Sequence, residues 1–321
     1  MGPCAGRVGP WRPRSRPGPG RAARTHPGRL AAHDPPGRHR RAGLPARARP
    51  RGAPAVGCGT IVRIERDGLV YYQFERLRAQ TGLRHGFFTR LGGVSQAPFA
   101  TLNVGASVGD DPLAVAENRR RCFAALGFAE AQVVSPNQVH STVVARVGRV
   151  QAGASIEATD GLMTDEPGIA LFLRFADCVP ILLFDRHLHV VALVHAGWRG
   201  TLHGIAPAAV QAMRSHYGSR PGDLWAGIGP AIGACCYEVG ADLAGEFRRR
   251  FGAGVVTQPA SGRPHLDLPG ANALALAEVG VREVELSGLC TACHVDEFFS
   301  HRREGGRTGR LGALVGLVCS E

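Results

Sequence analysis

The sequence predicts a single α+β domain that follows a basic N-terminal tail. From about residue 60 onward, short apolar runs typical of buried strands alternate with segments of helical periodicity. No repeat period and no second low-complexity linker interrupts residues 60–321. That length suits one large domain with an ample hydrophobic core. We therefore expect a tail over residues 1–55 and one domain over residues 60–321.

Capping residues and apolar runs define the expected elements. Asp111 and Pro112 form an N-cap and first-turn pair for a helix through Leu126, which Gly127 closes. Further helices are expected at about 201–217, 238–251 and 270–280. The expected strands cover residues 70–75, 85–90, 132–147 with a break at Pro136, 168–175, 179–185, 189–197, 223–229 and 282–288.

The N-terminal tail carries the whole net charge of the chain. Residues 1–55 hold 13 of the 38 basic residues and one acidic residue, Asp34, so the rest of the chain is formally neutral. The tail is rich in Pro, Gly and Arg without hydrophobic periodicity, so we expect it to be disordered. It fits a spurious upstream start or dispensable tail, an organelle transit peptide, or a nucleic-acid-binding arm. The neutral body does not indicate a nucleic-acid partner.

Composition excludes several kinds of chemistry and location. All 38 basic residues are arginine, so Schiff-base chemistry and a P-loop, which need lysine, are excluded. No run approaches the ~18 apolar residues of a membrane span, and the N-terminus has no apolar signal region. We therefore expect a cytoplasmic protein without a membrane partner. Its nine cysteines are expected to be reduced thiols or metal ligands.

Three apolar segments end in side chains that bind metals. His140 ends PNQVH, Cys178 ends ALFLRFADC and His195 ends VVALVH. Imidazole and thiolate are favoured zinc ligands, and three protein ligands leave a fourth position open, as in catalytic sites. The spacings of 38 and 17 residues are not diagnostic, because buried His and Cys are common in cores. Asp177 and Gly197 place charge and open backbone where a buried strand should have neither, which favours a site.

The same segments carry a family resemblance. The blocks NQVH, FADCVPILLFD and VHAGWRGT resemble those of the peptidoglycan editing factor family, also called the multicopper polyphenol oxidase or laccase-type domain family. Further similar blocks are HGFFTRLGGVSQAPFATLNVG, ENRRR, DGLMTD, GIGPAIGACCYEV, LDL and FFSHRREGGRTGR. They follow in collinear order over about residues 60–318 and leave the tail uncovered.

The resemblance implies a fold, a metal and several activities. It implies one α+β domain layered α/β/β/α with mixed sheets, and one zinc ion bound by His140, Cys178 and His195. The implied activities are phosphorolysis of purine nucleosides (adenosine, inosine and methylthioadenosine) and deamination of adenosine. A separate implied role is amidase-type removal of a wrong amino acid from a peptidoglycan precursor. His301 departs from the tyrosine more usual in the family, and Gly305–Gly306 lengthens that loop; both could affect substrate preference.

Phosphorolysis needs a clamp for phosphate, and arginine binds oxyanions with two parallel hydrogen bonds. Arg90, Arg199 and Arg310 lie beside or near glycines, which permits close backbone approach. Arg199 could also stabilise developing charge. Arg302 and Arg303 are further candidates, and for any of these arginines a solvated surface charge is the alternative. Asn103 is a candidate hydrogen-bonding partner of the substrate, with a turn asparagine as the alternative.

The general acid or base stays unassigned. The H-x-E and P-C-x-x-C segments of zinc nucleoside deaminases are absent around these ligands. Asp177 is adjacent to a ligand, but neighbouring strand residues point to opposite faces, so it can be structural.

Other motifs carry weaker signals. CTACH (290–294) matches the C-x-x-C-H pattern of haem attachment, and without an export signal we set that interpretation aside. As a redox dithiol or second metal site it offers only two clustered thiols. Cys235 and Cys236 are adjacent thiols, which are usually inert when buried. GIGPAIG (227–233) lacks the nucleotide-binding fingerprint and is expected to form a turn after a strand.

The leading hypothesis is therefore a zinc-dependent purine nucleoside phosphorylase with adenosine deaminase activity that acts on small molecules. Amidase-type editing of a cell-wall precursor is the alternative enzyme. A copper-dependent polyphenol oxidase is disfavoured, because the chain has three methionines and copper centres need clustered His and Met ligands. The non-enzymatic alternative is nucleic-acid binding through the tail.

Overall fold

The structure, a computed structural model, describes residues 55–58 and 60–319. The prediction for the tail concerns residues that, apart from Ala55, lie outside the described ones. The helices are α1 Glu75–Arg78, α2 Pro112–Ala125, α3 Trp198–Leu202, α4 Ile205–Tyr217, α5 Ala241–Phe251 and α6 Leu268–Glu278. The strands are β1 Ala55–Cys58, β2 Ile61–Arg66, β3 Leu69–Phe74, β4 Leu83–Phe88, β5 Val133–Pro136, β6 Val144–Arg146, β7 Ser155–Ile156, β8 Gly161–Thr164, β9 Ala170–Phe175, β10 Val179–Asp185, β11 Val190–Ala196, β12 Leu224–Ile228, β13 Val256–Thr257, β14 His265–Leu266, β15 Glu283–Leu286 and β16 Leu311–Leu317.

Two seven-stranded sheets contain most of the strands. The first sheet has the order β1-β15-β12-β10-β11-β8-β6, and the second has the order β2-β3-β4-β16-β9-β5-β7. Both are mixed: β12 pairs with β15 in parallel, for example, whereas β10 pairs with β11 antiparallel. This arrangement confirms the predicted α+β fold with mixed sheets. None of the helices in the described part of the chain is long and apolar enough to cross a bilayer.

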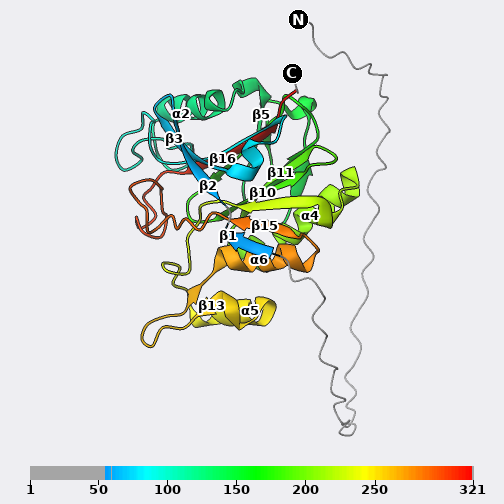
Figure 1. The fold of residues 1–321 in the computed structure, drawn as a ribbon. Coiled ribbons are helices and arrows are strands. Elements are labelled where there is room, and N and C mark those ends of the chain that lie inside the picture. The colour runs from blue at the N-terminus through cyan, green and yellow to red at the C-terminus, as the bar shows by residue number, and fades with distance from the viewer. Residues whose placement is uncertain (1–54, 59, 320–321) are drawn as a thin grey trace, which may run out of the picture. The chain divides into compact units, whose positions relative to one another are not determined.

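Three hydrophobic layers hold the sheets and helices together. One lies between α2 and the second sheet, where the Phe123 and Phe172 rings meet edge to face at 4.9 Å. The middle one lies between the two sheets, where Phe74 meets Trp225 at 5.0 Å between ring centroids. The third packs α4 and α6 on the first sheet. The order α2, second sheet, first sheet, α6 can be followed from top to bottom in Figure 1, and it is the predicted α/β/β/α layering.

Strand alternation in β11 directs one predicted ligand between the sheets. Val190, Ala192 and Val194 belong to the layer under α4 and α6, whereas Val191 and Leu193 belong to the layer between the sheets. Successive side chains of a strand point to opposite faces. The side chain of the penultimate residue, His195, therefore enters the layer between the sheets.

The structure contains the predicted helices, but one of them is divided into two. The Asp111 side chain accepts a hydrogen bond from the Leu113 amide at 3.0 Å and caps α2 as predicted. The segment 201–217 was expected to form one helix, but α3 and α4 divide it at Gly204, whose φ of 85° is left-handed. A residue in that conformation interrupts helical hydrogen bonding, and glycine adopts it without strain.

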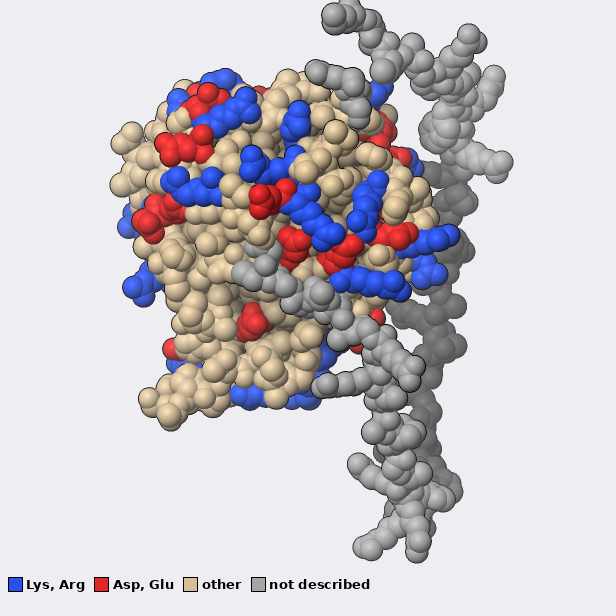
Figure 2. Space-filling view, viewed as in Figure 1, with Lys and Arg blue, Asp and Glu red and all other residues tan. Residues whose placement is uncertain are grey.

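Charges of both signs lie close together on one face of the molecule. In Figure 2, basic and acidic side chains are interspersed over the face shown. Arg76 and Arg186, for example, both contact the Glu283 carboxylate, at 2.5 and 2.7 Å. The neutral body predicted from the sequence thus shows no single-sign patch on this face.

Candidate metal centre

The three predicted ligands come together at one end of the layer between the sheets. One donor atom each from His140, Cys178 and His195 lies within 4.8 Å of the others. His195 is 4% exposed at the end of β11, Cys178 directly precedes β10, and His140 lies exposed in the loop between β5 and β6. The two imidazole rings meet at 75° with their centroids 4.9 Å apart. This arrangement lets three donors face a common point.

Backbone geometry brings these side chains close. His140 has a φ of 62° and Asp177, next to Cys178, has a φ of 78°. Such left-handed conformations are uncommon for residues with a Cβ and gather at functional sites. A Cβ at Gly197 would lie 2.8 Å from His140 Cδ2 and 3.1 Å from Cys178 Sγ. Glycine is therefore needed at position 197 to leave room for two of the three ligands.

Asp160 organises both histidines through one buried carboxylate. Its Oδ1 lies 2.9 Å from His195 Nδ1, while Oδ2 accepts hydrogen bonds from the amides of Val139 and Ser141 at 3.1 and 2.6 Å. The first contact favours the tautomer with the proton on Nδ1, which leaves Nε2 free as a metal ligand. The second set fixes the loop that carries His140.

The protonation states suit a metal ligand set. Burial raises the pKa of the Cys178 thiol, but the charge of His195 and hydrogen bonds with His140 and His195 outweigh burial and lower it to about 6. Burial lowers the pKa of His195, but Cys178 and Asp160 together raise it to about 9. These opposite shifts favour a thiolate beside an imidazolium in the metal-free protein. A bound metal ion would take the place of the imidazolium proton.

The donors open into a cavity of about 380 Å³. Arg174 and Arg310 line it together with Gln138, His301 and all three ligands. Burial lowers the pKa of Arg174 to about 10, helped by the nearby charges of Arg119 and Arg310. Among the described residues neither Arg174 nor Arg310 has a carboxylate within ion-pair distance. Arg174 donates to the Pro136 carbonyl at 2.7 Å, and Arg310 donates to the Thr308 and Gly309 carbonyls at 3.0 Å. Partly buried cations that lack a carboxylate partner suit a bound anion.

A second, adjoining cavity of about 250 Å³ shares His140, Cys178 and His301 with the first. Trp198, Tyr237 and Arg302 are among its other lining residues. Aromatic side chains in a cavity wall suit a flat group such as a heterocycle. The metal donors therefore lie between a cationic compartment and an aromatic one.

The structure gives the other predicted substrate residues different surroundings. Asn103 is fully buried, and its Oδ1 accepts the Arg310 amide at 2.8 Å. Arg90 donates to the Ala100 carbonyl at 2.9 Å and to Glu304 at 3.0 Å, and Arg199 is exposed over the Trp198 ring at 4.4 Å. Of the four predicted substrate-binding residues, Arg310 is the one that lines the 380 Å³ cavity. Asn103 instead holds the segment from which Arg310 projects.

Asp177, Arg302 and Arg303 have different surroundings. The Asp177 carboxylate accepts the Thr291 hydroxyl and the Arg302 amide, each at 2.7 Å. Arg302 lies over the Tyr237 ring at 5.0 Å and lines the smaller cavity, whereas Arg303 is exposed. Asp177 thus joins two loops next to Cys178, in keeping with a structural role.

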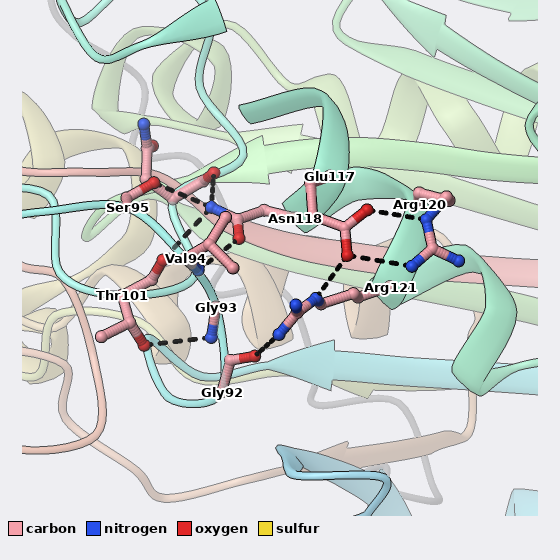
Figure 3. Close-up of polar contacts among 10 residues, drawn as sticks. Gly92, Gly93, Val94, Ser95, Thr101, Glu117, Asn118, Arg120 and Arg121 are labelled. Atoms are coloured by element: carbon pink, nitrogen blue, oxygen red, sulfur yellow. Dashed lines mark hydrogen bonds and ion pairs between the residues drawn. The ribbon is translucent and has the colours of Figure 1, made fainter. Parts of the chain in front are cut away.

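Helix α2 holds the loop that leads to Asn103 (Figure 3). The Asn118 side chain accepts the Val94 amide at 2.9 Å and donates to Ser95 Oγ and the Asn103 carbonyl, both at 2.8 Å. Arg121 donates to the Gly92 carbonyl at 3.1 Å and pairs with Glu117. The block ENRRR therefore fixes the loop behind Arg310.

Sequence reasoning did not assign Asp160, Arg174 or Gln138. Arg174 interrupts an apolar strand, which is a visible signal, because an arginine there must be paired or face a cavity. Asp160 precedes the buried strand β8, and its partners are distant in sequence. The Gln138 side chain donates to the Arg174 carbonyl at 2.8 Å and accepts the Arg174 amide at 2.9 Å. Nothing in the sequence around Gln138 predicts this pairing.

The two-sheet fold and the cluster of three metal-competent donors at its edge define the class of protein. Residues 84–318 match the family described as multi-copper polyphenol oxidoreductase laccase. The chain belongs to this family. The purine nucleoside phosphorylase of Deinococcus radiodurans is 43% identical over 233 residues, which cover 73% of this chain and 88% of that protein. The purine nucleoside phosphorylase YlmD of Geobacillus stearothermophilus is 40% identical over 243 residues, 72% of this chain and 89% of that protein.

Solved structures show the same fold. The crystal structure of YlmD from Geobacillus stearothermophilus matches with a TM-score of 0.75 and 37% identity over 80% of this chain and 98% of that chain. The hypothetical protein YfiH of Bacillus licheniformis matches with a TM-score of 0.74 and 34% identity over 79% of this chain and 97% of that chain.

Proposed function

We propose that this protein is a zinc-dependent purine nucleoside phosphorylase of the cytoplasm, with adenosine, inosine and methylthioadenosine as substrates and adenosine deamination as a second activity. The names of two relatives support the phosphorylase activity. The observation that carries the proposal is the pair Arg174 and Arg310, which faces the His–Cys–His donors across one cavity without a carboxylate partner. All these residues belong to the predicted domain 60–321.

The residues present fit a zinc ion. Two imidazoles and one thiolate are a common catalytic zinc set with an open fourth position, and Asp160 fixes the tautomer of His195 for it. His140, Cys178 and His195 would hold the ion, which as a Lewis acid would polarise the substrate or activate water. Copper fits less well, because the described methionines, Met163 and Met213, are buried in the layer under α4, away from the donors.

Each compartment has its own role in this proposal. Arg174 and Arg310 bind and orient phosphate, and they spread its charge during attack on the ribose carbon. Trp198 and Tyr237 hold the purine ring in the smaller cavity. Asn103 and Asp160 act as positioning residues for Arg310 and for the two histidines.

The test incubates the protein with inosine or adenosine, with and without phosphate. We expect ribose-1-phosphate and free base only when phosphate is present. Arg310→Gln should raise the KM for phosphate at least about tenfold, the range for a lost charged hydrogen bond. It should leave deamination of adenosine, which uses no phosphate, nearly unchanged. Arg303→Gln is the matched control, because Arg303 is exposed.

Other products would point elsewhere. Absence of phosphate-dependent base release from metal-loaded protein would falsify the phosphorylase assignment. Release of an amino acid from a muramoyl-serine nucleotide, without nucleoside cleavage, would support the amidase alternative. Oxidation of phenols would support the copper oxidase only if it followed bound copper in metal analysis.

A further inference from the structure

Four cysteines from two distant segments meet outside the site described above. The sulfur atoms of Cys235, Cys236, Cys290 and Cys293 all lie within 4.8 Å of one another. Cys293 Sγ is 3.4 Å from both Cys235 Sγ and Cys236 Sγ. The sequence alone indicated only the Cys290–Cys293 pair as a cluster. The fold supplies the second pair, because β12 and β15 run in parallel and their following loops leave the same end of the sheet.

The sulfur positions match a tetrahedral metal–thiolate site. Zinc–sulfur bonds of about 2.3 Å place the sulfurs of a tetrahedron about 3.8 Å apart. Two of the observed sulfur–sulfur distances are 3.4 Å, and all of them are within 4.8 Å, so this value lies within the observed range. The pairs at 3.4 Å are far longer than a disulfide bond of about 2.05 Å, and all four residues are free thiols.

The backbone around the cluster is also arranged for thiolates. The Gly233 amide donates to Cys290 Sγ at 3.2 Å, and such N–H···S bonds favour the negative charge of a metal-bound sulfur. A Cβ at Gly233 would approach Cys235 Sγ to 3.3 Å and the Cys290 Cβ to 3.4 Å. A side chain at this position would therefore crowd both cysteine pairs.

We propose that Cys235, Cys236, Cys290 and Cys293 bind a second zinc ion in a closed, structural four-thiolate site. Four protein ligands leave no open position, which separates this site from the three-ligand centre and assigns it no catalytic step. Zinc replaces the thiol protons, which pass to solvent, and no oxidation occurs. Two of the sulfurs belong to exposed residues, Cys235 and Cys293, so the ion can enter from solution.

The ion would connect the two loops that support the first site. Ile232, in the loop of Cys235, donates its amide to the Asp177 carbonyl at 3.0 Å. Thr291, in the loop of Cys290, donates its hydroxyl to the Asp177 carboxylate at 2.7 Å. Asp177 precedes Cys178. The second zinc therefore stabilises the backbone that presents one ligand of the first.

The test measures the number of zinc ions bound per chain. Reduced, full-length protein is loaded with Zn²⁺, and the unbound Zn²⁺ is removed before metal analysis. We expect about two zinc ions per chain in the wild type and about one in Cys293→Ser. Cys319→Ser is the matched control and should keep two, because Cys319 is an exposed free cysteine outside the cluster. Cys178→Ser should lose the other ion only, so the two sites fail independently. Equal zinc content in Cys293→Ser and the wild type would overturn the proposal.

A cobalt spectrum tests the four-cysteine site in a protein whose four cysteines are all intact. Cys178→Ser protein loaded with Co²⁺ should show the intense visible and near-ultraviolet bands of four-thiolate cobalt. A cobalt spectrum typical of oxygen and nitrogen ligands alone would refute the zinc site. So would a disulfide between these cysteines that persists under reducing conditions, or bound iron with acid-labile sulfide.

Discussion

At the scale of single residues, the Asp160 carboxylate connects the two histidines of the metal centre. One oxygen contacts His195 Nδ1 and the other accepts the amides of the loop that holds His140. Burial raises the pKa of Asp160, but His195 and the hydrogen bonds from Ser141 lower it to about 2. The carboxylate is therefore ionised throughout the neutral range and can support both ligands.

Replacement of Asp160 by asparagine should weaken metal binding while the fold is kept. The amide keeps the shape of the side chain but has only one acceptor oxygen, so its NH2 group faces either His195 Nδ1 or the amides of Val139 and Ser141. Loss of such a partner reduces metal affinity about 10- to 100-fold, which chelator competition can measure. Ser141→Ala is the milder control, because it keeps the backbone amide that bonds to Asp160. It removes the hydroxyl donor to Asp160 at 2.9 Å and the exposed hydrogen bond that the hydroxyl accepts from the Val143 amide at 3.2 Å. Equal affinities in Asp160→Asn and the wild type would argue against the positioning role.

The sequence indicated the three candidate donors that the fold brings together, but not the residues that support them. The apolar patterns placed Cys178 and His195 at or next to buried strands, as the structure has them, whereas His140 lies in an exposed loop after β5 and not at the end of a strand. The resemblance singled out all three. Asp160 and Arg174 act through partners 19 to 38 residues away, so their roles depend on how strands are paired. Asn103 was expected to contact substrate. An asparagine near a glycine in a polar loop does not indicate by itself that its side chain bonds to protein groups.

At the scale of elements, α2 connects the outer layer to the cavity. Asn118 on its inner face bonds to the loop at Val94 and Ser95 and to the Asn103 carbonyl (Figure 3). Asn103 in turn accepts the Arg310 amide. A helix on the far side of the second sheet thus helps to fix a cation of the cavity.

Asn118→Ala should destabilise the protein and also impair phosphate binding. It removes the buried side-chain partner of the Val94 amide, at a cost of about 2–4 kcal/mol in the free energy of unfolding, measurable by urea denaturation. In the assay with inosine the KM for phosphate should rise more than kcat falls, because Arg310 loses part of its support. Leu113→Ala, at a side chain of the same helix that is 78% exposed, should change both quantities little. An unchanged KM in a destabilised variant would disprove the connection to Arg310.

Element boundaries were predictable where local chemistry sets them. Asp111 and Pro112 start α2. The apolar runs of β10 and β11 predict strands without any information about their neighbours in the fold. The continuous helical pattern across 201–217 did not reveal the division at Gly204, because a glycine within such a pattern is often simply helical. The order of strands could not be read from the apolar runs, since β16 lies between β4 and β9, which are far from it in sequence.

At the scale of the whole molecule, the stacked sheets enclose polar groups that water cannot reach. His85 in β4 is fully buried, and its Nε2 accepts the Phe74 amide at 2.9 Å. Burial, helped by the charge of Arg78, lowers the pKa of His85 from its ordinary value of 6.5 to about 3. The folded state therefore holds a neutral imidazole that the unfolded chain would protonate in mild acid.

Stability should consequently fall as the pH falls from 7 toward 3. Between the two pKa values the unfolded chain binds more protons, so the contribution of His85 is complete above 6.5 and is lost below it. Acidification from about pH 7 to about pH 4.5 should cost about 2–3 kcal/mol through this residue. His85→Gln should show a shallower pH dependence in urea denaturation, whereas the exposed His187→Gln should keep that of the wild type. Parallel pH profiles of wild type and His85→Gln would refute this account.

The parallel pairing of β12 with β15 also has a consequence for the order of assembly. Cys235 and Cys293 are 58 residues apart, and α5 and α6 lie between them. During synthesis, Cys235 and Cys236 leave the ribosome well before their partners. The four sulfurs can meet only after the crossover has folded back onto the sheet. Uptake of an ion there would therefore mark a newly made chain as having completed this half of its fold.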